Sequence, residues 1–128
     1  MSVRVYHYPG CSTCKRALAW LAARGVDVET VDIVRATPSR DDLRAMWKLS
    51  GLPIAAFFNT SGVSYRAANL KERMPSLSDE EKLGMLAADG KLIRRPLVLT
   101  RTTALVGFRE PTYAAAFKAG RKGSVEAD

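Results

Sequence analysis

The two cysteines of this chain, Cys11 and Cys14, lie between a segment that alternates like a strand and a segment with helical periodicity. The strand pattern covers residues 3–8 and the helical pattern covers residues 15–24, so the Cys-x-x-Cys pair falls at the start of a helix. A helix N-terminus carries partial positive charge and free N–H groups, and both favour a thiolate over a thiol. Since the thiolate is the reactive form, this position predicts a redox-active pair.

The first part of the chain is predicted to form a β-α-β unit. A second alternating segment, residues 26–33, follows the glycine stop at Gly25, so the two strands should be parallel, with a right-handed crossover. We expect Ser12 or Thr13 to cap the intervening helix, because short polar side chains are favoured at that position.

The last part of the chain is predicted to be β-β-α. Residues 97–100 and 104–108 have the pattern of two short antiparallel strands, and residues 111–118 that of a final helix. Together with the first unit, this order indicates an α/β protein with a thioredoxin-like fold, β-α-β then β-β-α. In that fold a cis-proline faces the cysteines, so we predict a cis bond at Arg95-Pro96.

Between the two halves, several helical patterns indicate a helical insertion at about residues 37–92. Ser39 and Ser78 are predicted N-caps of two of its helices, and Ser78 begins a capping box. We therefore expect one domain over residues 1–119 and a disordered tail over residues 120–128, which are rich in glycine, serine and charge.

Charge and composition limit the classes of function. The formal net charge is +7 and the sequence pI is near 9.8, which is typical of a protein with an acidic partner or anionic ligand, or of a solvated basic surface. The basic residues are dispersed, and no base-reading pattern is present, so direct nucleic-acid binding is not expected. No stretch approaches the ~20 apolar residues of a membrane span, and no secretory signal is recognisable, so we expect a cytoplasmic protein, as a monomer.

The cysteine pair has three possible uses. A structural disulfide fits poorly with a cytoplasmic location, and structural zinc requires four ligands where the chain offers two cysteines and His7. A redox role therefore remains, with Cys11 as the nucleophile beside Lys15 or Arg16, and with Cys14 as the resolving cysteine. The alternative for Cys14 is a small buried side chain, with Cys11 acting alone through glutathione.

Other side chains have more than one interpretation. Arg95 is expected to contact an anion beside Cys11, whereas Arg94 is expected to be solvated. His7 could tune the thiolate, although a lone histidine at a strand end is more often structural. Trp20 and Trp47 fit the apolar spacing of helices and are expected in the core.

Nearly the whole chain, residues 3–117, resembles the arsenate reductase C/Spx family, whose members share a thioredoxin fold with a helical insertion. The resemblance rests on several segments in a fixed order and spacing. These are Tyr-Pro-Gly-Cys-Ser-Thr-Cys-Lys-Arg-Ala at residues 8–17, Pro-Ser-Arg-Asp-Asp-Leu at 38–43, Phe-Phe-Asn-Thr-Ser-Gly at 57–62, Leu-Ile-Arg-Arg-Pro-Leu-Val at 92–98 and Val-Gly-Phe at 106–108.

The resemblance implies a site centred on Cys11, the position of the single catalytic cysteine of the arsenate reductases. Of three arginines that hold the oxyanion in those enzymes, only Arg95 has a counterpart, because Asn59 and Phe108 occupy the other two positions. Asn59 could then serve as a polar wall of the cleft. With the cis-proline beside the cysteines, the expected anion or substrate contacts are Arg95, Lys15, Asn59 and Pro96.

Three functions follow from the resemblance and from the cysteine pair. The first is a thiol–disulfide oxidoreductase that uses Cys11 and Cys14 and is reduced by glutathione, glutaredoxin or thioredoxin. The second is an Spx-like redox-sensing regulator that binds the RNA polymerase α subunit, with Gly51 at the position of an interface glycine. The third is an arsenate reductase. We expect no tightly bound cofactor and no metal, with glutathione as a co-substrate.

Overall fold

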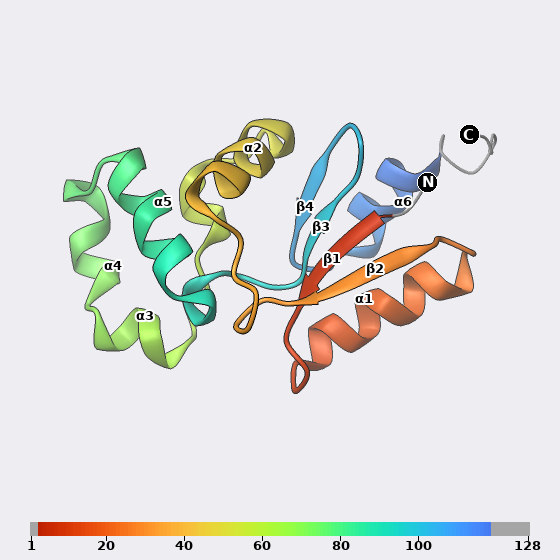
Figure 1. The fold of residues 1–128 in the computed structure, drawn as a ribbon, viewed down its shortest axis with the longest axis horizontal. Coiled ribbons are helices and arrows are strands. Elements are labelled where there is room, and N and C mark those ends of the chain that lie inside the picture. Colours follow the sequence, from red (N-terminus) through yellow and green to blue (C-terminus); the bar gives the residue numbers. More distant parts are fainter. Residues whose placement is uncertain (1–2, 119–128) are drawn as a thin grey trace.

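A four-stranded mixed sheet lies at the centre of the protein in a computed structural model, which describes residues 3–118 (Figure 1). The helices and strands follow one another in the predicted order, β-α-β, a run of helices, then β-β-α. In chain order they are β1 (Val3–His7), α1 (Ser12–Ala23), β2 (Val28–Asp32), α2 (Arg40–Ser50), η1 (Ile54–Phe57), α3 (Val63–Ala67), α4 (Leu70–Arg73), η2 (Met74–Ser76), α5 (Asp79–Ala88), η3 (Gly90–Leu92), β3 (Leu97–Leu99), β4 (Ala104–Val106) and α6 (Glu110–Lys118).

The strands are arranged in the order β2-β1-β3-β4. β1 and β2 are parallel, as predicted, and His7 lies opposite Asp32 at the end of the pair. β3 is antiparallel to both β1 and β4. Because β1 is central and ends just before Cys11, the sheet fixes the position from which α1 begins.

Alternation along the strands divides the core between the two faces of the sheet. Val5 and Val98 contribute to a cluster with the apolar side chains of α1 and α6. Their neighbours Tyr6 and Leu97 contribute to a second, larger cluster with the helices between β2 and β3. The sheet therefore has the first and last helices on one face and the insertion against the other, which is the expected thioredoxin-like arrangement.

The two tryptophans lie at the margins of these clusters rather than at their centres. Trp20 is half-buried and meets Tyr113 edge-on, with ring centroids 5.6 Å apart, while the Arg24 guanidinium covers its ring at 4.1 Å. Trp47 is also half-buried, and its indole N–H donates to the Leu52 carbonyl at 2.9 Å. Their amphipathic rings close the edges of the core.

The helices of the insertion begin where the sequence predicts. The Ser39 hydroxyl accepts a hydrogen bond from the Asp42 amide at the start of α2. Ser78 and Glu81 form a complete capping box at the start of α5. α3, α4 and α5 gather at one end of the molecule (left in Figure 1).

Gly90 marks the closest approach between the insertion and the sheet. A Cβ at this position would lie 2.2 Å from the Ile33 carbonyl oxygen, directly after β2. Only glycine allows the backbone of η3 to pass so near the end of a strand. The chain that leads into β3 therefore passes directly beside the end of β2.

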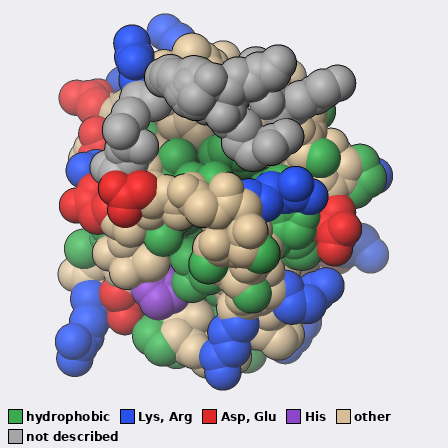
Figure 2. Space-filling model, turned by 90° about the vertical axis from the view of Figure 1, so that its right-hand side faces the viewer, with side chains coloured by type: hydrophobic (Ala, Val, Ile, Leu, Met, Phe, Trp, Pro, Cys, Tyr) green, Lys and Arg blue, Asp and Glu red, His purple; other side chains and the backbone are tan. Residues whose placement is uncertain are grey.

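On the face shown in Figure 2, Lys and Arg side chains lie at separate places, with Asp and Glu between some of them. This matches the dispersed basic residues of the sequence. Among the helices of residues 3–118, none has the length and apolar character needed to cross a bilayer. The predicted disordered tail, residues 120–128, lies outside the described residues.

Candidate active site

Cys11 is the N-cap of α1, and its side chain performs the capping. The Cys14 amide donates to Cys11 Sγ at 3.3 Å, and the Cys11 amide donates to the Tyr8 carbonyl at 3.0 Å. The expectation that Ser12 or Thr13 caps this helix is therefore wrong, because the helix begins at Ser12 and the sulfur takes the position of the usual oxygen acceptor. The reactive atom is thus held at the positive end of the helix dipole.

The Cys11 thiol is half-buried, and burial alone would raise its pKa. Hydrogen bonds from the Cys14 thiol and from the amides of Cys14 and Thr13, together with the charge of Arg95, outweigh that effect. The net result lowers the pKa of Cys11 below its ordinary value. The thiolate is therefore available at lower pH than in a free cysteine.

The pKa of Cys14 is shifted in the opposite direction. Its side chain is 1% exposed, and burial, followed by its hydrogen bond to Cys11, raises the pKa of Cys14 to about 12. Both cysteines are reduced in the structure. One turn of helix therefore carries an accessible thiol that ionises readily and an enclosed thiol that keeps its proton.

Arg95 lies beside this pair and is held by the surrounding chain. Its guanidinium lies 4.8 Å from the centre of the Tyr8 ring, and Nη1 donates long hydrogen bonds of 3.4 Å to the carbonyls of Lys91 and Ile93. The Arg95–Pro96 bond is cis, as predicted. Pro96 itself is buried, and its carbonyl accepts a hydrogen bond from the Gly107 amide at 2.9 Å.

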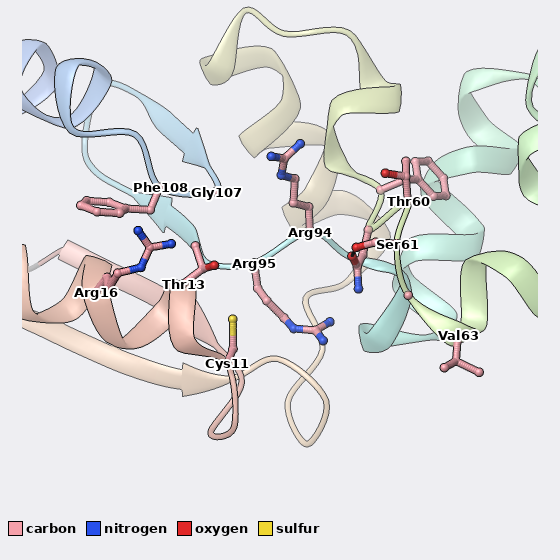
Figure 3. A pocket seen from close by; sticks show the side chains of 13 residues that line it. Cys11, Thr13, Arg16, Thr60, Ser61, Val63, Arg94, Arg95, Gly107 and Phe108 are labelled. Carbon is pink, nitrogen blue, oxygen red and sulfur yellow. Dashed lines mark hydrogen bonds between the residues drawn. The ribbon is translucent and has the colours of Figure 1, made fainter.

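An open cleft of about 720 Å³ lies in front of Cys11 (Figure 3). Its walls come from the start of α1, from the turn after η1, from the segment before β3 and from the loop after β4. The residues that line it are Cys11, Thr13, Arg16, Phe58, Asn59, Thr60, Ser61, Gly62, Val63, Arg94, Arg95, Gly107 and Phe108. Within the described part of the chain, this lining has three arginines and no carboxylate.

The structure brings some of the predicted site residues together and leaves others aside. Cys11, Arg95 and Asn59 all line the cleft. Cys14 lies behind Cys11, in contact with its sulfur through the amide. Pro96 supports Arg95 from within the core and does not line the cleft.

Two other predicted residues lie outside the cleft. Lys15 is exposed and is not part of the lining, whereas its neighbour Arg16 is. His7 is at the end of β1, opposite Asp32, and also lies outside the lining. A functional role for either residue stays a prediction.

Arg94 was expected to be solvated, and its side chain is exposed, yet it forms part of the cleft wall. The neighbouring sequence does not indicate this position, because it depends on the path of the chain before β3. Figure 3 shows the two guanidinium groups pointing to different parts of the cleft, with Arg95 on the side of Cys11.

The wall opposite Cys11 is a tight turn at residues 59–62. The Gly62 amide donates to the Asn59 carbonyl at 3.2 Å, and a Cβ on Gly62 would lie 2.6 Å from Asn59 Nδ2. The Asn59 amide donates to the Leu92 carbonyl at 2.7 Å, and the Arg94 amide donates to the Phe57 carbonyl at 2.8 Å. Backbone hydrogen bonds therefore connect this wall to the segment that carries the two arginines.

The described residues offer no grouped set of metal ligands. Within residues 3–118, no three histidine, cysteine or carboxylate side chains gather where they could hold one ion. The chemistry that the arrangement offers is therefore that of a thiolate in a cationic cleft.

Comparison with known proteins agrees with the geometry. The sequence model of the ArsC family matches residues 6–116. The chain belongs to the ArsC family. Among solved structures, a Bacteroides fragilis protein described as ArsC family related has a TM-score of 0.87 and 40% identity, over 90% of this chain and 97% of that one. The thioredoxin-like fold with its helical insertion is thus shared with this relative.

Relatives within the ArsC family have different names. YusI of Bacillus subtilis, described as uncharacterised, is 42% identical over 113 residues, which cover 88% of this chain and 96% of YusI. An arsenate reductase of Rhizobium meliloti is 33% identical over 99 residues, 77% of this chain and 69% of that protein. The global transcriptional regulator Spx of Streptococcus pyogenes is 25% identical over 108 residues, 84% of this chain and 79% of the regulator. Family membership supports thiol-based redox chemistry.

Proposed function

We propose that the protein is a thiol–disulfide oxidoreductase that works through the pair Cys11 and Cys14. The observation that carries the proposal is the difference between the two thiols of one helical turn. Cys11 is accessible and has a lowered pKa, while Cys14 is enclosed and keeps its proton up to a pKa of about 12. A nucleophile and a resolving thiol need this difference, because only one of them should attack the substrate.

In the first step, the Cys11 thiolate attacks one sulfur of a disulfide RS–SR′. The new bond joins Cys11 to the RS group, and R′S⁻ leaves and takes up a proton. The Cys14 amide and Arg95 favour the thiolate before the attack. The open cleft admits the substrate to the sulfur.

In the second step, Cys14 attacks the Cys11 sulfur, releases its proton and displaces RS⁻, which leaves a Cys11–Cys14 disulfide. Two electrons have then passed from the protein dithiol to the substrate disulfide. One of the causes that raise the pKa of Cys14, its hydrogen bond to Cys11, is removed once Cys11 is part of a mixed disulfide. Its loss lowers the pKa of Cys14 after the first step, while the larger effect of burial remains.

Glutathione, a glutaredoxin or thioredoxin supplies the two electrons that restore the dithiol and is itself oxidised to a disulfide. Glutathione serves in this scheme as a co-substrate, and no tightly bound cofactor is needed. The cytoplasm provides the reducing environment in which the pair would cycle.

The test is a titration of the two cysteines in defined glutathione redox buffers, with the disulfide identified by peptide mass spectrometry. A reversible Cys11–Cys14 disulfide with a midpoint of roughly −200 to −300 mV is expected. Coupled turnover with glutathione reductase or thioredoxin reductase should then be lost in Cys11→Ser. Formation of glutathione adducts at Cys11 alone would replace the dithiol scheme with a one-cysteine mechanism, and inert thiols would refute the proposal.

A redox-sensing adaptor is the second candidate. Leu49 and Leu52 are 40% and 39% exposed at the end of α2 and flank Gly51, so apolar surface is available for a protein partner. The similarity to Spx makes the RNA polymerase α subunit the partner to test. An adaptor would be oxidised stoichiometrically and bind the subunit differently in its two redox states, whereas an oxidoreductase turns over.

Arsenate reduction is the third candidate, favoured by the similarity to the Rhizobium meliloti enzyme. Arg95 supplies one guanidinium beside Cys11, while Asn59 and Phe108 supply none. Arsenate-dependent NADPH consumption in the same coupled assay would select this function.

A further inference from the structure

Two arginines of the cleft lie against the β4–α6 loop (residues 107–109) rather than against the cysteines (Figure 3). A Cβ placed on Gly107 would lie 3.2 Å from Arg94 Nε. The Arg16 guanidinium lies 5.8 Å from the centre of the Phe108 ring. Neither guanidinium forms an ion pair with any carboxylate of residues 3–118.

The contacts of Arg95 differ from those of Arg16 and Arg94. Its guanidinium contacts the Tyr8 ring and two backbone carbonyls, and its charge lowers the pKa of Cys11. Arg95 thus acts on the thiolate, while Arg16 and Arg94 present N–H donors to the rest of the cleft. Each guanidinium has five such donors, in a planar arrangement that matches a carboxylate.

The positions of these groups indicate where parts of a ligand would lie. A molecule with its sulfur at Cys11 and its carboxylates at Arg16 and Arg94 would reach from the start of α1 to the β4–α6 loop, and the cleft volume of about 720 Å³ is sufficient for it. The turn at residues 59–62, opposite Cys11, adds amide and hydroxyl groups but no charge. The cleft therefore combines cationic groups, polar uncharged groups and one reactive sulfur.

We propose that Arg16 and Arg94 form a carboxylate-binding subsite at the β4–α6 loop, and that it selects disulfides of small, carboxylate-bearing thiols as the substrates of Cys11. The chemistry of this step rests on the proposed thiol–disulfide function, but the binding does not. Thioredoxin is the reductant in this scheme, because a dithiol restored by glutathione would only regenerate the glutathione disulfide that it had reduced. Arg16 and Arg94 are specificity-determining residues in this scheme, since they contact the ligand away from the exchanging sulfurs.

The binding is tested with S-methylglutathione, which carries two carboxylates and cannot exchange. Its dissociation constant is measured by NMR titration of the amide signals of Cys11 and Gly107. Arg16→Gln and Arg94→Gln should each weaken binding about tenfold, which corresponds to about 1.4 kcal/mol. Arg94→Lys, which keeps the charge and loses the planar fork, should lie between wild type and Arg94→Gln.

Two controls separate specific binding from the general effect of charge. Arg101→Gln removes the same charge from the exposed β3–β4 turn and should leave the dissociation constant unchanged. The dimethyl ester of S-methylglutathione should bind wild type about as weakly as the acid binds the double variant Arg16→Gln/Arg94→Gln. Equal binding of acid and ester, or equal losses in Arg101→Gln and Arg94→Gln, would overturn the subsite.

The selectivity is tested with stopped-flow oxidation of the reduced protein. Oxidised glutathione should react about tenfold faster than the uncharged hydroxyethyl disulfide. This preference should be lost in Arg16→Gln/Arg94→Gln and kept in Arg101→Gln. Faster reduction of a protein disulfide such as insulin than of oxidised glutathione would contradict the substrate class. Binding of S-methylglutathione without any exchange would refute the proposed function while supporting the subsite.

Discussion

The Cys14 amide donates a hydrogen bond to Cys11 Sγ over 3.3 Å, so the helix that carries both cysteines is capped by its own nucleophile. If the Cys11 sulfur moved away from the Cys14 amide, which stabilises its thiolate, the N-terminus of α1 would lose its cap. Substrate attack and helix capping therefore involve the same atom. The reactivity of the pair is set by the first turn of α1 and by the arginine beside it.

The side chain of Cys14 should influence the ionisation of Cys11. Cys14→Ala removes the thiol donor to Cys11 but keeps the amide donor, so the pKa of Cys11 should rise. Cys14→Ser retains a hydroxyl donor and should produce a smaller rise. The measurement is the pH dependence of iodoacetamide alkylation at Cys11, and an unchanged profile in Cys14→Ala would contradict the role of the thiol.

Arg95 should affect the thiolate more than Arg94 does, although the two are adjacent. The charge of Arg95 lowers the pKa of Cys11, so Arg95→Gln should shift the alkylation profile to higher pH. Arg94 lies against Gly107 instead, and Arg94→Gln should shift the profile less. Equal shifts in both variants would indicate that the summed positive charge of the cleft, and not Arg95 in particular, lowers the pKa of Cys11.

Alkaline pH should destabilise the protein through Cys14. The folded pKa of Cys14 is about 12, above the ordinary value of 9.0, so the folded state keeps a proton that the unfolded state releases. Stability from this group is complete below pH 9.0 and falls as the pH rises toward 12. Urea unfolding of the reduced protein at increasing pH should show that the free energy of unfolding falls more steeply for wild type than for Cys14→Ser. The same fall in both proteins would contradict the contribution of Cys14.

Gly90 should be intolerant of any side chain. Gly90→Ala would place a methyl group 2.2 Å from the Ile33 carbonyl oxygen, and the shift needed to relieve it should lower the free energy of unfolding by about 3 kcal/mol. Gly10→Ala is the matched control, because nothing lies within 4 Å of its added Cβ. Chemical denaturation compares the two, and similar stability of both variants would show that η3 can move away from β2.

The Tyr113 hydroxyl should stabilise the loop beside the cleft. It donates to the Gly107 carbonyl at 2.7 Å in a buried position, while the ring meets Phe108 edge-on at 4.8 Å. Tyr113→Phe keeps the ring and leaves a buried carbonyl without its partner, so the free energy of unfolding should fall by about 1–3 kcal/mol. Urea denaturation measures this loss, and Tyr65→Phe, whose hydroxyl forms no such bond among the described residues, is the control.

The fold could be predicted from the sequence because its signals are local. Alternation marks the strands, and Ser39 and Ser78 mark the helix starts that the structure confirms. The cap of α1 was missed for a physical reason. Capping preferences are dominated by oxygen acceptors, which Ser12 and Thr13 offer, whereas here the sulfur of Cys11 accepts the bond.

The cleft could be predicted only in part, because its walls come from distant segments. Cys11, Arg95 and Asn59 were expected there and lie there. The choice between Lys15 and Arg16 depends on a rotation of about 100° between neighbouring helical residues, which no local signal fixes. Arg94 lies along the wall because of the path of the chain before β3, a tertiary feature that its sequence neighbours do not reveal.

The hydrogen bonds between the turn after η1 and the segment before β3 have a mechanical consequence. The Asn59 amide donates to the Leu92 carbonyl, and the Arg94 amide donates to the Phe57 carbonyl. Between these two hydrogen bonds, Phe58 forms an isolated β-bridge with Ile93. The segment continues directly into β3, which pairs with β1, the strand that leads to Cys11. The wall formed by residues 59–62 and the wall that carries Cys11 thus belong to one continuous hydrogen-bonded backbone framework. We therefore expect the width of the cleft to stay the same when a ligand binds.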